Sequence, residues 1–342
     1  MRIEFISNAS IVIYCADGTT ILCDPWLSEG VFHGSWYNFP PLNEQQLKTY
    51  RNLRPDYIYI SHSHPDHLDP KTLTLYDKNT PVLIGKYAHN HLFRTISGLN
   101  FTDIRELALG EFMNFDSLEV AILPQFAGSA DGHPDDVGYA LDSSLWVKDA
   151  DGTQLLHLVD NPTKPRDAQQ LVERYGQPDV ALVPYSGASF FPHAFSHYDS
   201  DQKHVLKDKV KKRRLEAFCE ITNILKPTQV IPAAGSYVMG GRIAHYSEFL
   251  HQATPDDLAA AWESKGNPST HLCMLTTGDV LEVASGDITQ GDDNGYRRFS
   301  EEERTAYALS LKDQSLPQDE IYLPPDFKLP WPRLLAKARR NQ

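Results

Sequence analysis

The chain has 342 residues, of which 41% are hydrophobic and 11% aromatic, a composition typical of a globular protein with a large core. Its formal net charge of −13 argues against a general nucleic-acid binder, because phosphate contacts need a basic surface. No apolar run approaches the roughly 20 residues that cross a bilayer, and no basic-then-apolar signal pattern begins the chain. We therefore expect a cytoplasmic protein without membrane contact. The four cysteines form no CxxC pattern, which predicts reduced thiols.

The apolar patterning predicts strands near the N-terminus, followed by alternating helices and strands. Strands at 11–14 and 20–23 flank Asp17-Gly18, a strong hairpin signal. The aromatic, proline-rich residues 31–43 predict a loop, either lining a substrate cleft or packing on the core. Further strands are expected at 57–60, 81–85, 118–123, 138–141, 145–148, 155–159, 180–183, 229–231, 272–276 and 280–283. Helices are expected at 70–76, 168–175, 204–225 and 255–265.

This order of elements, without internal repeats, favours a single α/β domain. We place that domain at residues 1–285 and treat 286–342 as a C-terminal extension packed on it. One basic stretch, residues 203–214, interrupts the acidic sequence. Pairs such as Lys207 and Lys211 repel each other four residues apart on a helix. The stretch is either a solvated helix face or a basic wall that attracts an anionic substrate.

The motif that carries most chemistry is His-Ser-His-Pro-Asp-His at residues 62–67. His62 and His64 are two residues apart, so an extended backbone at a strand exit points both imidazoles the same way. A proline then breaks the strand, and Asp66 with His67 lies in the following turn. Four metal-binding side chains within six residues can therefore serve two adjacent cations.

Two cations need ligands beyond this motif, usually a third histidine and a shared carboxylate. Asp160 is the best carboxylate, because it follows an apolar strand that would present it at the sheet edge. His133 lies just before another expected strand and is the best third imidazole. For the last ligand of the second metal, the residues leave His245, His193 and His197 open.

Two other residues are expected to support the site. Asp24, at the end of the second expected strand, is suited to orient a ligand imidazole. His157 is three residues from Asp160 and points to the opposite face of its strand, so we expect a structural role for it.

Together, Asp24-Pro25-Trp26, the 62–67 motif, His133 and Asp160 resemble the metallo-β-lactamase superfamily. This resemblance implies an αββα sandwich with two metal ions at one edge of the stacked sheets. A more extended resemblance, over about residues 1–285, is to the metallo-β-lactamase-like domain of CMP-N-acetylneuraminic acid hydroxylases. It includes Asn8-Ala9-Ser10 and the glycine-containing loop at 186–189.

The resemblance also implies how the ligands are shared. It assigns the first metal to His62, His64 and His133, and makes Asp160 the bridge between the metals. Asp66, His67 and a last histidine would hold the second metal. Ala233-Ala234-Gly235 stand where the superfamily usually has that last histidine, and the hydroxylase-like pattern nominates His245 downstream.

Two functions follow from this resemblance. The favoured one is a non-haem di-iron oxygenase that attacks a C–H or N–H bond of a small anionic metabolite, nucleotide-linked substrates included. The alternative is a di-zinc hydrolase of a phosphoester or lactone, and manganese is a further alternative metal. Asp66, as a proton acceptor, and Asp160 are the expected catalytic residues.

The resemblance departs from the hydroxylases in one respect that bears on partners. Those hydroxylases carry a Rieske iron–sulfur domain, and this chain has no Cys-x-His pair to build one. Electrons for an oxygenase would therefore come from a separate Rieske-type or other donor protein, or from the substrate.

Overall fold

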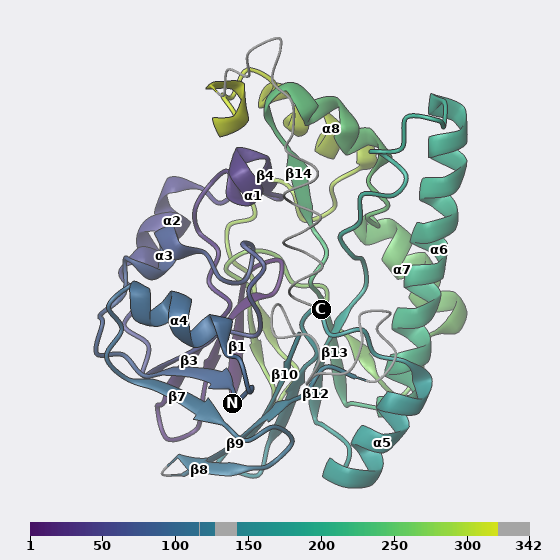
Figure 1. Cartoon of the computed structure of the whole chain (residues 1–342). Helices are drawn as coiled ribbons and strands as arrows, with labels where there is room; N and C mark the ends of the chain where they lie inside the picture. Colours follow the sequence, from purple (N-terminus) through teal and green to yellow (C-terminus); the bar gives the residue numbers. More distant parts are fainter. Residues whose placement is uncertain (116, 127–141, 321–342) are drawn as a thin grey trace, which may run out of the picture.

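In the computed structural model, which describes residues 1–115, 117–126 and 142–320, two β-sheets are stacked face to face with helices on both outer faces (Figure 1). This confirms the expected α/β class and the αββα metallo-β-lactamase-like sandwich. Among the described residues, the first sheet has the strand order β17 (Ile288–Thr289), β16 (Val280–Glu282), β1 (Arg2–Ser7), β2 (Ser10–Tyr14), β3 (Thr20–Cys23), β5 (Tyr57–Tyr59), β6 (Val82–Gly85) and β7 (Ile104–Leu107).

The second sheet mixes an antiparallel half with a parallel half. Its order is β15 (His271–Leu272), β13 (Gln229–Ala233), β12 (Val180–Pro184), β11 (Gln154–His157), β10 (Ser144–Lys148), β9 (Leu118–Leu123) and β8 (Met113–Phe115). The neighbours β11, β12, β13 and β15 are parallel, as are β3, β5, β6 and β7 in the first sheet. The carboxyl ends of such parallel strands meet at one edge of a sheet, which is where α/β proteins usually bind ligands.

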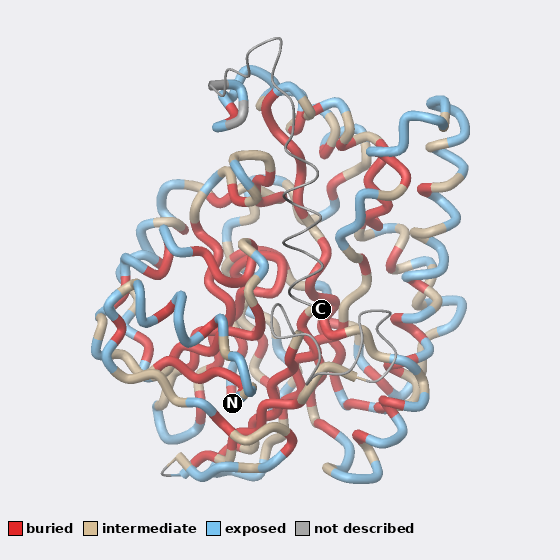
Figure 2. The backbone as a smooth tube through the Cα atoms, viewed as in Figure 1, coloured by how far each residue is buried: buried red, intermediate tan, exposed pale blue. Residues whose placement is uncertain are grey.

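Both faces of each sheet are covered, which explains why the strands are apolar on both sides. Ile13 and Leu182 pack between the sheets, whereas Val12 faces the helices α2 (Glu44–Arg51), α3 (Pro70–Leu73) and α4 (His91–Gly98). On the opposite side, Trp146 packs towards α5 (Pro165–Tyr175), α6 (Ser200–Leu225) and α7 (Pro255–Lys265). Figure 2 shows the buried residues concentrated in the strands. No helix in the described ranges is long and apolar enough to cross a membrane.

The described part of the C-terminal extension joins the rest of the fold in two ways. The strand β17 pairs with β16 in the first sheet, with Val280 opposite Thr289. The helix α8 (Glu301–Ser310) buries Ala308 against Phe39 in an aromatic cluster. The short 3-10 helices η1 (Gly241–Phe249) and η2 (Pro317–Glu320) and the short helix α1 (Val31–Gly34) complete this end of the molecule.

Most expected strands and helices are present, and the main difference arises from a long-range strand pairing. The Asp17-Gly18 hairpin is confirmed, with Gly18 at a φ of 93°. The loop expected over 31–43 is wrong for Val31–Gly34, which forms α1, and for Trp36–Asn38, which forms β4 and pairs with β14 (Tyr237–Met239). This pairing joins residues about 200 positions apart, so no local pattern predicts it. The strand expected at 138–141 lies outside the described residues.

Candidate metal centre

The metal-binding motif lies at the carboxyl ends of two parallel strands. Cys23 of β3 is paired in register with Tyr59 of β5, so the residues that follow the two strands meet at the sheet edge. Asp24 follows β3 directly, and the 62–67 motif follows β5. The backbone N–H of His67 donates to the His64 carbonyl at 3.0 Å, which closes the turn that the motif predicts.

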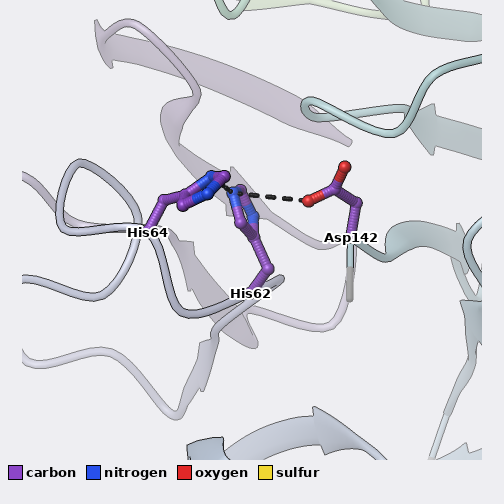
Figure 3. A group of neighbouring side chains, drawn as sticks. All are labelled: His62, His64 and Asp142. Carbon is purple, nitrogen blue, oxygen red and sulfur yellow. Dashed lines mark hydrogen bonds and ion pairs between the residues drawn. The ribbon is translucent and has the colours of Figure 1, made fainter. Parts of the chain in front are cut away.

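One cluster in this loop contains His62, His64 and Asp142 (Figure 3). His62 Nε2 lies 2.7 Å from His64 Nδ1 and 3.6 Å from Asp142 Oδ1. Burial, with the neighbouring His67, lowers the pKa of His62 well below its usual value. The imidazole is therefore neutral at physiological pH, which is the form that binds metals.

Asp142 is a candidate ligand that our sequence reasoning missed. It stands two residues before β10, in the second sheet, and its side chain is mostly buried. The available signal was a carboxylate between two apolar runs, which is a weak pattern compared with the 62–67 motif.

A second cluster combines His62, His67 and Asp160. His67 Nε2 is buried, lies 3.2 Å from Asp160 Oδ2 and 3.4 Å from Asp66 Oδ2, and has no hydrogen-bond partner of good geometry among the described residues. Burial alone lowers the pKa of His67, but the carboxylates of Asp66 and Asp160 outweigh it and raise the pKa well above its usual value. The cluster therefore concentrates negative charge where a cation would lie.

Asp24 holds the ring of His67 from behind. Its Oδ2 lies 2.9 Å from His67 Nδ1, and it accepts hydrogen bonds from the backbone N–H of Ser61 at 2.8 Å and from the Ser61 hydroxyl at 2.6 Å. A carboxylate bonded to Nδ1 fixes the ring so that Nε2 points into the cluster. This contact corresponds to the supporting role that the sequence predicted for Asp24.

Asn8 holds Asp66 in a similar way. The Asn8 amide Nδ2 donates to Asp66 Oδ2 at 3.2 Å, and Asn8 Oδ1 accepts from the backbone N–H of Gly235 at 2.7 Å. Asn8 lies in the tight connection between β1 and β2 with a φ of 50°, a conformation that asparagine tolerates better than most residues. Sequence reasoning did not assign Asn8 to the site.

Of the other four histidines nominated as ligands, one is outside the described residues and three lie away from the two clusters. His133 lies outside the described residues. His245 is exposed on η1 with its ring 4.2 Å from that of Tyr246, and His197 is exposed beside Tyr198. Within the described ranges, neither they nor the buried His193 joins the two clusters.

His157 has the structural role that its strand position predicts. Its Nε2 lies 3.0 Å from the carbonyl oxygen of Ala9, and its Nδ1 accepts from the backbone N–H of Val159 at 3.3 Å. Both ring nitrogens are therefore used within the fold.

An aromatic group lies beside His64, the exposed member of the first cluster. Trp36 of β4 stacks on Tyr237 of β14, with ring centroids 3.6 Å apart and planes at 9°. Phe32 lies 4.2 Å from the Trp36 ring and 6.1 Å from the His64 ring. The pairing of two distant segments thus brings an apolar surface beside His64.

The donor atoms fit a pair of transition metals. Imidazole nitrogens and carboxylate oxygens suit iron, zinc and manganese. The ligand atoms in each cluster lie within 4.8 Å of one another, and His62 belongs to both clusters. His67 Nε2 in addition offers a buried nitrogen with no protein hydrogen bond in the described structure.

A metallo-β-lactamase fold with a His/Asp cluster at its sheet edge is the class that the geometry defines. A family model described as "Beta-lactamase superfamily domain" matches residues 2–234. The chain therefore belongs to the β-lactamase superfamily, whose members are mostly metal-dependent enzymes.

The similar proteins include a Rieske protein, a hydroxylase and a metal-dependent hydrolase. One, from Mycolicibacterium smegmatis, is named as a Rieske 2Fe-2S iron-sulfur protein and is 27% identical, covering 69% of this chain and 43% of its own length. A cytidine monophosphate-N-acetylneuraminic acid hydroxylase from Asterias rubens is 26% identical, with coverage of 85% and 43%. A "UPF0173 metal-dependent hydrolase" from Staphylothermus marinus is also 26% identical, with coverage of 82% and 97%. The chain thus spans less than half the length of the first two.

Solved structures show the same fold. An isothiocyanate hydrolase from Delia radicum gut bacteria superposes with a TM-score of 0.56 at 16% identity, over 82% of this chain and 98% of that one. CmlA, a diiron beta-hydroxylase from Streptomyces venezuelae, has a TM-score of 0.50 at 18% identity, over 85% and 54%. At these identities the similarity concerns the fold alone.

Proposed function

We propose that this protein is a dinuclear-metal enzyme, and specifically a non-haem di-iron oxygenase that acts on a small anionic metabolite. The observation that carries the proposal is the pair of ligand clusters that share His62. The similarity to cytidine monophosphate-N-acetylneuraminic acid hydroxylases over 85% of the chain favours oxygenase chemistry.

In the proposed site, His62 and His64 hold one ion, together with Asp142 or His133. Asp66 and His67 hold the other, and His245, which lies outside the two clusters in this structure, stays the proposed last ligand. Asp160 is shared between them. When bound, a pair of ferrous ions would supply the reduction of dioxygen and an oxidant for a C–H or N–H bond.

The protein groups have separate tasks in this scheme. Asp24 keeps His67 Nε2 facing the cluster, and Asn8 holds Asp66 as a proton acceptor at the site. The stacked rings of Trp36 and Tyr237 exclude water from one side of the bound substrate.

The source of electrons is the second part of the proposal. A relative of this chain is named for a Rieske 2Fe-2S centre, which is an electron-transfer group, and the four cysteines of the chain are buried and free. We therefore propose a separate Rieske-type or other donor protein as a partner, unless the substrate itself is the reductant.

A di-zinc hydrolase is the second candidate. It is favoured by the metal-dependent hydrolase from Staphylothermus marinus, which the chain matches over 97% of that protein's length. In this function a bound metal pair would supply an activated water with a pKa of about 7. Asp66 would then accept the proton released as a phosphoester or lactone is attacked.

The deciding experiment measures metals and oxygen on the full chain, expressed without added metal. An oxygenase should contain about two iron ions per chain and, once reduced with dithionite, consume dioxygen faster when sugar nucleotides are added. Zinc as the sole metal, with turnover of bis(p-nitrophenyl) phosphate or a simple lactone under nitrogen, would instead establish the hydrolase and reject the oxygenase.

A further inference from the structure

A second group of buried polar side chains lies at the same sheet edge as the metal clusters. The strands β11, β12 and β13 are parallel neighbours, and Asp160, Ser186 and Gly235 follow them in turn. Gly235, which bonds Asn8, packs so closely on Ser186 that a Cβ on the glycine would collide with the serine Cβ. A series of contacts through Gly235 and Asn8 therefore links Ser186 to the proposed ligand Asp66.

Two cations of α6 lie against this loop. A Cβ added to Gly187 would meet the Arg214 guanidinium carbon at 3.2 Å, so the guanidinium packs directly on the glycine backbone. Lys203 Nζ donates to the His193 carbonyl at 3.0 Å. The two cations are eleven residues apart on the helix, which is about three turns, so they share one face.

These two cations differ from the others on the same helix face. Lys207 and Lys211 both pair with Glu301, at 2.7 Å and 2.6 Å. Among the described residues, no carboxylate forms an ion pair with Lys203 or Arg214. The positive charge at the two ends of this face therefore has no carboxylate counterion in the described structure, and Lys203 Nζ lies 5.6 Å and 5.3 Å from the ring centroids of Tyr246 and Phe249.

Two histidines near these cations are buried with unused ring nitrogens. His251 is 1% exposed and neither of its ring nitrogens has a hydrogen-bond partner in the described structure, while His193 is 3% exposed with Nδ1 unpartnered. Burial lowers the pKa of both to about 4, helped by Lys203 for His193 and by Arg214 for His251. Both rings are neutral at pH 7, so each offers one N–H donor.

The Ser186 hydroxyl is also buried and unpartnered among the described residues. Leaving a buried polar group unpaired costs about 1–3 kcal/mol, so such groups are rare in folded proteins. Of the three, Ser186 directly precedes the glycine on which Arg214 packs, and His193 and His251 are close enough to Lys203 and Arg214, respectively, for these cations to lower their pKa. Hydrogen-bond donors combined with uncompensated positive charge are the requirement for binding an oxyanion.

We propose that Ser186, His193, His251, Lys203 and Arg214 form a subsite for the oxyanion of the substrate, a phosphoryl or carboxylate group. Arg214 is exposed and closes the subsite from the solvent side, and Gly187 lets its guanidinium approach the backbone. The identity of the bound molecule as substrate rests on the proposed function. The anion binding itself does not require the metals.

The test uses the full chain after a chelator has removed any bound metal. This protein is titrated in a calorimeter with inorganic phosphate and, in a separate experiment, with acetate. We expect saturable binding that Arg214→Gln weakens roughly tenfold or more, the loss of one charge-assisted hydrogen bond. Arg213→Gln is the matched control, because it removes the same charge from an exposed neighbour on the same helix. Tighter binding of phosphate assigns a phosphoryl group, and tighter binding of acetate assigns a carboxylate.

The subsite is rejected if neither anion binds saturably, or if Arg213→Gln and Arg214→Gln weaken binding equally. His193→Gln, with folding checked by circular dichroism, provides a second variant that should also weaken binding. Because the titration uses metal-free protein, its result is independent of the iron and oxygen measurement. Anion binding that depends on Arg214 in a chain that takes up no iron would retain the subsite and reject only the oxygenase.

Discussion

At the scale of single residues, the metal centre depends on side chains that hold the ligands in place. Asp24 accepts three hydrogen bonds, two from Ser61 and one from His67. The bonds from Ser61 hold the carboxylate in place, and the carboxylate in turn fixes the orientation of the imidazole. Asn8 does the same for Asp66. Partners of this kind usually change metal affinity by roughly 10- to 100-fold when they are removed.

The ligands themselves give the most direct residue-scale prediction. His64→Ala and Asp160→Ala should each lose most of the bound metal, because each removes a ligand atom from one cluster. Both should keep the fold, since the His64 side chain is exposed and the Asp160 side chain is 30% exposed. Metal content by mass spectrometry of the purified protein, with circular dichroism for the fold, measures both expectations.

His89→Ala serves as the control, because His89 is an exposed histidine outside both clusters. It should retain the full metal content. Retention of both ions by His64→Ala or Asp160→Ala would show that the ligand assignment is wrong.

At the scale of elements, the basic helix α6 is joined to the C-terminal helix α8 by buried charges. Lys207 is 4% exposed and pairs with Glu301 at 2.7 Å, and Lys211 pairs with the same carboxylate at 2.6 Å. Lys207 and Lys211 therefore serve helix packing, whereas Lys203 and Arg214, on the same face of the helix, have no carboxylate partner among the described residues.

Removing the shared carboxylate should destabilise the protein in a pH-dependent way. Burial raises the pKa of Glu301, but hydrogen bonds from Lys207 and Lys211 outweigh it and lower the pKa to about 2. Because this value is below that of an unfolded glutamate, the pair stabilises the fold above about pH 4.5 and loses its effect as the pH falls towards 2. We expect Glu301→Gln to lower the free energy of unfolding by about 2 kcal/mol at pH 7.

Urea denaturation of both proteins at several pH values measures this difference, which should shrink below pH 4.5. Glu302→Gln is the control, since Glu302 is an exposed neighbour on the same helix turn. A difference between wild type and Glu301→Gln that stays constant between pH 7 and pH 3 would contradict the proposed role of the ion pairs.

At the scale of the whole molecule, the two clusters join loops from both sheets. His62, His64 and His67 follow β5 of the first sheet, whereas Asp160 follows β11 and Asp142 precedes β10 in the second sheet. A cation held by both sets of side chains binds the folded protein and has no comparable site in the unfolded chain.

Metal loading should therefore raise thermal stability. At a free metal concentration about 100 times the dissociation constant, the gain is about 2.7 kcal/mol. Differential scanning calorimetry of metal-free protein, with and without ferrous iron under nitrogen, should show a midpoint several degrees higher with metal. Asp160→Ala should lose most of this gain, and an equal gain in the variant would mean that the metal binds elsewhere.

Much of the fold was predictable because strands and helices follow local patterns. The strand at 118–123 and the helix at 255–265 have the expected bounds, and the 62–67 motif lies in a turn after a strand, as its spacing indicates. The pairing of β4 with β14 was missed, because it joins residues about 200 positions apart. Asp142 and Asn8 were missed for the same reason, since their partners are distant in the chain.

The sequence by itself determined that a dense His/Asp motif follows a buried strand, and its resemblance to the metallo-β-lactamase superfamily implied a sandwich with two metals at its edge. Spacing over a few residues governs strand exit, turn and side-chain direction, so such features can be read locally. Only the tertiary structure decided which distant groups meet that motif, and that the basic helix divides into paired lysines and unpaired cations. Those contacts depend on which strands and helices become neighbours, a property of the packed chain rather than of any one segment.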